Sequence, residues 1–249
     1  MVKDGLWDPY NNFHMGNAAE LAVKEFKISR QAQDEFAIES YKRAQAALKD
    51  GSFKNETVAV EVGGKAGTTS FDTDEEPGKA RFDKIPELRA AFDKEGTITA
   101  ANASKINDGA AALVIAGEGA VKDRALKPIA RVVAYTSFAQ DPKWFTTAPV
   151  TAIERVLRMA KLGSSDIDLY EINEAFSMVT MHTMQKLSIP HAKTNIHGGA
   201  VALGHPIGAS GARILTTLIH ALGAKQKQFG LATLCVGGGE GVAMIVERM

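Results

Sequence analysis

The sequence is nearly free of cysteine: Cys235 is the only one among 249 residues. A single cysteine excludes an internal disulfide and any zinc site built from four cysteines. An excess of one charge is lacking as well, because 29 Lys and Arg residues balance 29 Asp and Glu residues. Binding to a phosphate backbone needs clustered positive charge, so we do not expect nucleic acid as a partner.

Long apolar runs are also missing. No stretch approaches the roughly 20 apolar residues that a membrane-spanning helix needs, so we expect no membrane association. The first residues, Met1-Val2-Lys3-Asp4, do not begin a signal peptide, and we expect a cytoplasmic location. What the chain does have is 45% hydrophobic and 23% charged residues, which is the composition of a globular protein with a sizeable core.

The N-terminal part is expected to consist of helices and loops. Ser29 is a suitable N-cap for a long amphipathic helix over residues 30–49, and Gly51 is suited to end it. The other elements expected here are helices over 17–26 and 86–92, a strand over 56–62 and an exposed loop over 63–84.

From about Thr97 onward, strands and helices alternate. Residues 110–116 form a continuous apolar run, which is typical of a buried strand. Further strands are expected over 128–135, 167–172, near Asn195, over 230–235 and over 242–247, with helices over 151–162, 174–187 and 207–222. This alternation predicts an α/β fold in which helices cover a sheet.

The expected helix over 207–222 is unusual because Arg213 is its only formally charged residue. A helix that is apolar on all sides must be covered on all sides. Since a single sheet covers only one side, we expect another segment or a second chain to pack against this helix.

His205 stands in the densest group of small residues, over 197–213, just before Pro206 and an expected helix. Small residues allow close backbone approach, and the free N–H groups of a helix N-terminus suit an oxyanion or a thiolate. A histidine in such a turn is either a catalytic group or a structural hydrogen-bonding residue, and its surroundings alone leave both interpretations open.

Cys235 follows an apolar segment and precedes Gly237, Gly238 and Gly239. A lone cysteine on a strand is usually inert, but these glycines leave space beside the sulfur and expose backbone N–H groups. They are not a dinucleotide-binding fingerprint, because the ten residues after Gly239 leave no room for a βαβ unit.

Asn173 and Glu174 stand where an expected strand passes into a helix. Side chains at this position commonly cap the helix, and capping is the simplest interpretation.

The histidine and acidic residues do not have the spacing of known metal-binding motifs. His191, His197 and His205 fit no standard zinc motif, and the acidic segment 72–76 is followed by Pro77 where a calcium loop needs glycine. We therefore expect no metal ion.

Three motifs occur together in a particular order: Asn173-Glu174-Ala175-Phe176, Gly204-His205-Pro206 and Cys235-Val236-Gly237-Gly238-Gly239. Upstream stand Phe13-His14-Met15-Gly16, Phe92-Asp93-Lys94-Glu95-Gly96-Thr97, Ala101-Asn102-Ala103-Ser104 and Asn107-Asp108-Gly109-Ala110. In order and spacing these motifs resemble those of thiolases of the acetyl-CoA acetyltransferase type. The resemblance extends over essentially the whole chain.

The resemblance implies an α/β fold of two similar βαβαβαββ halves, stacked in five layers, with a CoA-binding loop domain inserted in the first half. It implies a loop domain over 1–106, the end of the N-terminal half over 107–128, and a C-terminal half over 129–249 with helices on both sheet faces. On this basis we expect the chain to be the C-terminal portion of a thiolase, lacking the N-terminal half.

The implied activity is Claisen chemistry: two acetyl-CoA molecules condense to acetoacetyl-CoA, or a 3-ketoacyl-CoA is cleaved. By resemblance, His205 activates a nucleophilic cysteine, and Cys235 removes a proton from the second acetyl group. Asn173, through water, helps His205 bind the thioester oxygen, and the Gly237 N–H lines a second oxyanion hole. An enolate needs such a base and such donors. A cysteine acts as this base only if its thiolate is accessible at neutral pH, which a nearby imidazole and exposed N–H groups favour.

Coenzyme A or acyl-CoA is expected as a substrate, with no tightly bound cofactor. The residues that the resemblance assigns to CoA binding are Leu6, His14, Met15, Leu88, Ala91, Phe92, Ala100, Ser104, Ala175 and Phe176.

One departure from the family pattern concerns the nucleophilic cysteine, which lies in a part of the family sequence with no counterpart here. Because Cys235 occupies the acid–base position, we expect the chain to be inactive alone. A complementary N-terminal thiolase segment or a second copy of the chain is the expected partner. Two alternatives stay open: a CoA-binding module without turnover, and a structural partner of a complete thiolase.

Overall fold

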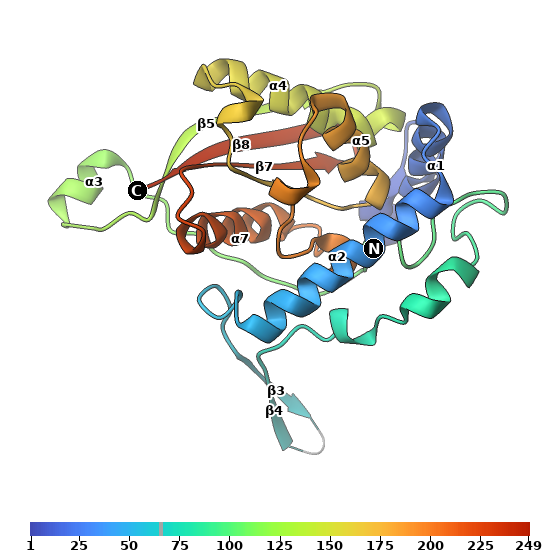
Figure 1. The fold of residues 1–249 in the computed structure, drawn as a ribbon, viewed down its shortest axis with the longest axis horizontal. Coiled ribbons are helices and arrows are strands. Elements are labelled where there is room, and N and C mark those ends of the chain that lie inside the picture. The colour runs from blue at the N-terminus through green and yellow to red at the C-terminus, as the bar shows by residue number, and fades with distance from the viewer. Residues whose placement is uncertain (65–66) are drawn as a thin grey trace.

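The computed structural model of the chain describes residues 1–64 and 67–249 (Figure 1). Residues 65 and 66, which belong to the expected loop over 63–84, lie outside the described residues.

A four-stranded sheet forms the centre of the C-terminal part, with strand order β5-β8-β7-β6. Its strands are β5 (Ala130–Ala139), β6 (Leu169–Ile172), β7 (Phe229–Val236) and β8 (Glu240–Arg248). β6 runs parallel to β7, whereas β5 and β7 are both antiparallel to β8. The strand expected near Asn195 is reduced to a single bridge between Tyr170 and Thr194.

Helices cover both faces of this sheet (Figure 1). On one face, α4 (Ala148–Ala160) packs Ile153 into a cluster with residues of the sheet, and α5 (Ser177–Leu187) also contacts α4. On the other face, α7 (Ser210–Ala224) packs Leu218 against the sheet. The expected thiolase-like α/β half with helices on both faces is confirmed.

The N-terminal part contributes two helices, α1 (Met15–Phe26) and α2 (Arg30–Asp50). Ser29 caps α2 as expected, because its Oγ accepts a hydrogen bond from the Ala32 N–H, and Gly51 ends the helix with a φ of 77°. α2 lies against α5 and the short helix α6 (Ala200–Leu203). The smaller elements are β1 (Trp7–Asp8), β2 (Phe13–His14), the hairpin of β3 (Val60–Gly64) and β4 (Gly67–Phe71), and α3 (Glu118–Asp123).

Further sequence-based expectations about elements are wrong. The expected loop over 63–84 contains β4 and the 3₁₀ helix Pro77–Lys79. The apolar run over 110–116 forms no strand, and Val114 is 97% exposed, because no neighbouring strand pairs with this segment in the described residues. The helix expected from residue 174 begins only at Ser177, since the residues before it face the site described below. In place of a helix over 86–92 there is a 3₁₀ helix, Phe82–Glu87.

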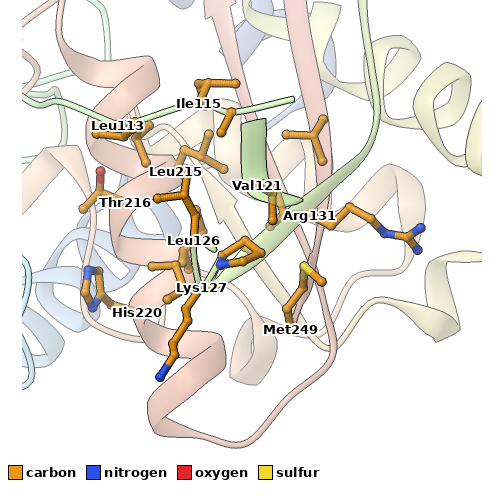
Figure 2. Close-up of a pocket in the computed structure, with 18 of the residues that line it drawn as sticks. Leu113, Ile115, Val121, Leu126, Lys127, Arg131, Leu215, Thr216, His220 and Met249 are labelled. Carbon is orange, nitrogen blue, oxygen red and sulfur yellow. The ribbon is translucent and has the colours of Figure 1, made fainter. Parts of the chain in front are cut away.

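A large cavity of about 970 Å³ lies beside α7. Its opposite wall is formed by the extended segment around residues 112–116 and by α3. Figure 2 shows Leu215, Thr216 and His220 of α7 on one side and Leu113 and Ile115 near them. Leu215, Thr216 and His220 of α7 therefore line this cavity, together with Ala130 and Val246 of the sheet. Within the part of the chain that the structure describes, no helix is both long and apolar enough to span a bilayer.

Candidate active site

Asn173 and His205 are brought together by the end of β6 and the turn before α7. The Asn173 N–H donates to the Thr233 carbonyl oxygen at 3.0 Å, which fixes Asn173 beside β7 at the carboxyl end of the parallel strand β6. Its Nδ2 lies 3.4 Å from Nε2 of His205. The Asn173 side chain is buried, and its Oδ1 has no hydrogen-bond partner within the protein.

His205 is held through both its backbone and its imidazole ring. Its backbone N–H donates to the Lys105 carbonyl oxygen at 3.0 Å, and its Nδ1 lies 2.5 Å from Ser210 Oγ. Burial, together with the positive charge of Arg213, lowers the pKa of His205 to about 4. The imidazole is therefore neutral at physiological pH.

Cys235 lies near the end of β7 and is only 6% exposed. It belongs to an apolar cluster that also contains Met15, Ala175 and Phe176. Burial raises the pKa of the Cys235 thiol to about 12. The condition of an accessible thiolate at neutral pH is therefore not met in the chain as it stands, because apolar side chains surround the sulfur.

Gly237 occupies the turn between β7 and β8, close to Met15. A Cβ atom placed on Gly237 would lie 3.3 Å from Met15 Sδ, so the turn and the start of α1 are in close contact. The hairpin that carries Cys235 thus meets one of the residues expected to bind CoA.

An aromatic group joins three of the residues expected to bind CoA. The ring of Phe92 stacks on His14 with centroids 4.9 Å apart, and it meets Phe176 edge-on at 6.0 Å. His14 also caps α1, because its Nδ1 accepts a hydrogen bond from the Gly16 N–H at 3.0 Å. Gly16 is required here, since a Cβ atom at this position would lie 2.2 Å from the Phe92 ring.

Backbone contacts attach Ser104 to the same group. Its N–H donates to the Ala175 carbonyl oxygen at 3.0 Å, and the preceding Ala103 forms a bridge with Phe176. Six of the ten residues expected to bind CoA are therefore linked by direct contacts or by the shared cluster around Cys235: His14, Met15, Phe92, Ser104, Ala175 and Phe176.

Leu88 and Ala100 lie elsewhere, in a smaller cavity of about 260 Å³. Four basic side chains line this cavity: Lys79, Arg81, Lys84 and Lys105. Burial lowers the pKa of Lys105 to about 8. Of the remaining two residues, Ala91 donates its N–H to the Ile98 carbonyl oxygen in a flanking turn, and Leu6 ends the short helix Val2–Leu6.

Glu174 does not cap α5, and neither does Asn173: the N-cap is Phe176, and no side chain makes a capping hydrogen bond. Instead the buried Glu174 carboxylate accepts hydrogen bonds from Ser40 Oγ at 2.7 Å, Asn195 Nδ2 at 2.8 Å and the Val201 N–H at 3.1 Å. It joins α2, α6 and the segment after β6. Burial raises the pKa of Glu174.

Two further groups near the site escaped the sequence analysis. Glu171 is buried on β6, with Oε2 3.6 Å from Nη1 of Arg213, and burial raises its pKa to about 8. Ser210 is buried against His205. The signals available were the lone charge of Arg213 in an apolar helix and a hydroxyl five residues after His205. Among the described residues, no three His, Cys, Asp or Glu side chains are placed to hold a metal ion.

Comparison with known proteins identifies the family. The family model described as "Thiolase, N-terminal domain" matches residues 1–119, and "Thiolase, C-terminal domain" matches residues 126–248. The chain is 49% identical to the acetyl-CoA acetyltransferase of Yarrowia lipolytica and 47% identical to that of Escherichia coli. These matches cover the whole chain but only 62% and 64% of those relatives.

Solved structures give the same result. The acetyl-CoA acetyltransferase of Bacillus anthracis superposes with a TM-score of 0.95 at 39% identity, covering 98% of this chain and 62% of that one. A thiolase from Ascaris suum in complex with coenzyme A superposes with a TM-score of 0.90 at 40% identity, covering 99% and 63%.

The matches also correct one expectation. Because residues 1–119 match the N-terminal domain, the chain carries parts of both thiolase domains and is not only a C-terminal portion. It spans a little under two thirds of the length of these relatives. From the two domain matches and the full-chain similarity, the chain belongs to the thiolase family.

Proposed function

We propose that this chain supplies the CoA-binding surface and the enolate-stabilising groups of a thiolase. The proposed reaction is the condensation of two acetyl-CoA molecules to acetoacetyl-CoA, or the reverse thiolytic cleavage of a 3-ketoacyl-CoA. The observation that carries the proposal is the pairing of Asn173 Nδ2 with His205 Nε2 at 3.4 Å, while the Asn173 N–H bonds to Thr233 of β7, the strand that bears Cys235.

The chemistry requires hydrogen-bond donors where negative charge develops on the thioester oxygen, and a base that removes a proton from the acetyl methyl group. We assign the first role to His205 with Asn173, and to the Gly237 N–H at a second oxyanion hole. We assign the second role to Cys235. The raised pKa of this thiol means that it is protonated in the chain alone, so the base must be activated when the site is complete.

CoA binding is assigned to the aromatic group and its neighbours. His14, Phe92 and Phe176 offer ring faces and edges to the pantetheine chain and the adenine, and most ligand sites combine such apolar walls with a few polar groups. The basic side chains around Leu88 and Ala100 are suited to the phosphates. We retain the division into a loop domain over 1–106, an N-terminal-half segment over 107–128 and a C-terminal half over 129–249.

The covalent step needs a nucleophilic cysteine that this chain does not provide, because Cys235 is its single thiol. We propose that a complementary N-terminal thiolase segment, or a second copy of the chain, covers the cavity beside α7. Two observations support this: the exposed apolar run at residues 112–116, and the similar relatives' greater length.

Co-expression tests the proposal. The chain is produced with the segment of the Yarrowia lipolytica relative that it does not match, and thiolysis of acetoacetyl-CoA is measured. We expect no turnover from the chain alone and turnover from the pair. In the pair, His205→Ala should lower turnover about 10³-fold or more and leave CoA affinity nearly unchanged.

His191→Gln, which alters a histidine outside the site, is the matched control and should retain turnover. Ordinary turnover by the His205→Ala pair would contradict the assignment.

A CoA-binding module without turnover is the second candidate, and the buried, protonated thiol of Cys235 favours it. In that case the co-expressed pair would bind CoA and remain inactive.

A further inference from the structure

Three polar contacts connect Asn173, His205, Ser210 and Pro206 in a row through the site. Asn173 Nδ2 lies 3.4 Å from His205 Nε2, His205 Nδ1 lies 2.5 Å from Ser210 Oγ, and Ser210 Oγ donates to the Pro206 carbonyl oxygen at 3.1 Å. The chain of bonds starts at the end of β6 and finishes in the turn that begins α7.

Ser210 has little freedom to move. It is the first residue of α7, its side chain is fully buried, and its backbone N–H donates to the same Pro206 oxygen at 2.9 Å. A hydroxyl group has one proton to donate. Because that proton goes to Pro206, the Ser210 oxygen presents its lone pairs to the imidazole.

We propose that Ser210 is a positioning residue, which holds His205 in the tautomer that carries its proton on Nδ1 and leaves the lone pair on Nε2. The Nδ1–H donates to Ser210 Oγ, and Nε2 accepts from Asn173 Nδ2. The inference rests on the proposed function, because it specifies how His205 serves the thiolase site. Nε2 receives the proton of an incoming thiol and, once protonated, donates to the thioester oxygen.

The opposite tautomer fits these contacts poorly. With the Asn173 amide in the orientation of the structure, a proton on Nε2 would face the N–H₂ group, so that two donors would oppose each other at 3.4 Å. Ser210 would then have to donate to Nδ1 and give up its bond to Pro206. The lowered pKa of His205 means that a neutral imidazole, for which the tautomer matters, is the form present at physiological pH.

Nitrogen NMR of the chain labelled at its histidine side chains tests the inference. Signals of His205 are assigned by their loss in His205→Gln. In the unaltered chain at pH 7, we expect Nδ1 to give the shift of a protonated, pyrrole-like nitrogen and Nε2 that of an unprotonated, pyridine-like one. A protonated Nε2 would overturn the proposal.

Substitution of the serine shows whether its hydroxyl is responsible. Ser210→Ala removes the acceptor and should change the tautomer ratio by about tenfold towards Nε2–H, since one net hydrogen bond is lost. Ser210→Thr keeps a hydroxyl and should restore the ratio. Ser177→Ala is the control, because Ser177 is a buried serine whose Oγ has no partner within the protein. An unchanged ratio in a folded Ser210→Ala chain would contradict the inference.

Failure of this inference and failure of the proposed function can be told apart. CoA affinity, measured by calorimetry on the same samples, reports on the proposed site and does not depend on the tautomer. If the chain binds CoA but His205 carries its proton on Nε2, the role of Ser210 is refuted and the proposed function is not. If the chain does not bind CoA, the proposed CoA site is refuted.

Discussion

Glu171 is a single buried residue that makes the stability of the chain depend on pH. Its carboxyl group is enclosed on β6, and burial outweighs the attraction of Arg213, so its pKa rises to about 8. In the unfolded chain the same group has its ordinary pKa of 4.5. Between these values the folded chain holds a proton that the unfolded chain releases, so stability falls as pH rises through this range.

The window from pH 6.5 to pH 8 separates this effect from that of two histidines with lowered pKa values. His182 and His205 have pKa values lowered to about 4, so they alter stability only below their ordinary pKa of 6.5, where stability rises with pH. The free energy of unfolding is measured with urea at pH 6.5 and at pH 8. We expect it to fall between these pH values by up to about 2 kcal/mol more in the unaltered chain than in Glu171→Gln.

Glu154→Gln, an exposed position on α4, is the control and should keep the pH dependence of the unaltered chain. Equal slopes for the unaltered chain and Glu171→Gln would contradict the assignment of a buried, protonated Glu171.

At this scale the motifs predicted that Asn173 and His205 act together, and the two side chains do lie 3.4 Å apart, but their other partners were not predicted. The motif types could be recognised because glycine and proline mark tight turns beside reactive side chains. The roles of Glu174 and Ser210 could not be predicted, because their partners come from distant segments: Ser40 is on α2, and the His205 contact depends on the turn before α7. Burial of Cys235 likewise depends on α1 and α5, which pack over its strand.

At the scale of elements, the docking of α1 depends on one glycine. A Cβ atom on Gly16 would overlap the Phe92 ring, with the nearest ring carbon at 2.2 Å. Gly16→Ala should therefore push Phe92 away from His14 and destabilise the chain by about 1–3 kcal/mol, the usual range for overpacking. Chemical denaturation measures the loss.

Gly223→Ala in α7 is the matched control, because nothing lies within 4 Å of a Cβ atom there. The same exchange should stabilise the chain by about 0.5–1 kcal/mol, since alanine loses less backbone entropy in a helix. Equal effects of the two substitutions would show that the contact with Phe92 is not tight.

Helix ends that residue type alone marks were predicted correctly. A strand whose formation depends on pairing with another strand was predicted wrongly. Ser29 and Gly51 mark the ends of α2 through capping and a positive φ, both readable from residue type. The apolar run over 110–116 has the composition of a buried strand, but a strand needs a neighbour to supply hydrogen bonds. The described residues provide none, and Val114 stays exposed.

At the scale of the whole molecule, two parts that are far apart in the sequence meet at one site. The N-terminal part brings His14, Met15 and Phe92, and the C-terminal sheet brings Phe176 and the hairpin that carries Cys235. The α/β class and the two-sided covering of the sheet could be predicted from the alternation of strands and helices. The sequence indicated only that the apolar helix α7 lacks a cover on one side. It did not indicate the cavity beside α7, because the opposite wall comes from residues 112–116, which were expected to form a strand.

Calorimetric titration of coenzyme A into the chain tests the central claim most directly, because the claim requires these two parts to form one CoA site. The account predicts one saturable site, with affinity about tenfold weaker in Phe92→Ala, which loses the ring between His14 and Phe176. Phe71→Ala on the exposed β3–β4 hairpin should bind as the unaltered chain does. Absence of saturable binding, or equal affinity of the folded Phe92→Ala chain, would contradict the account.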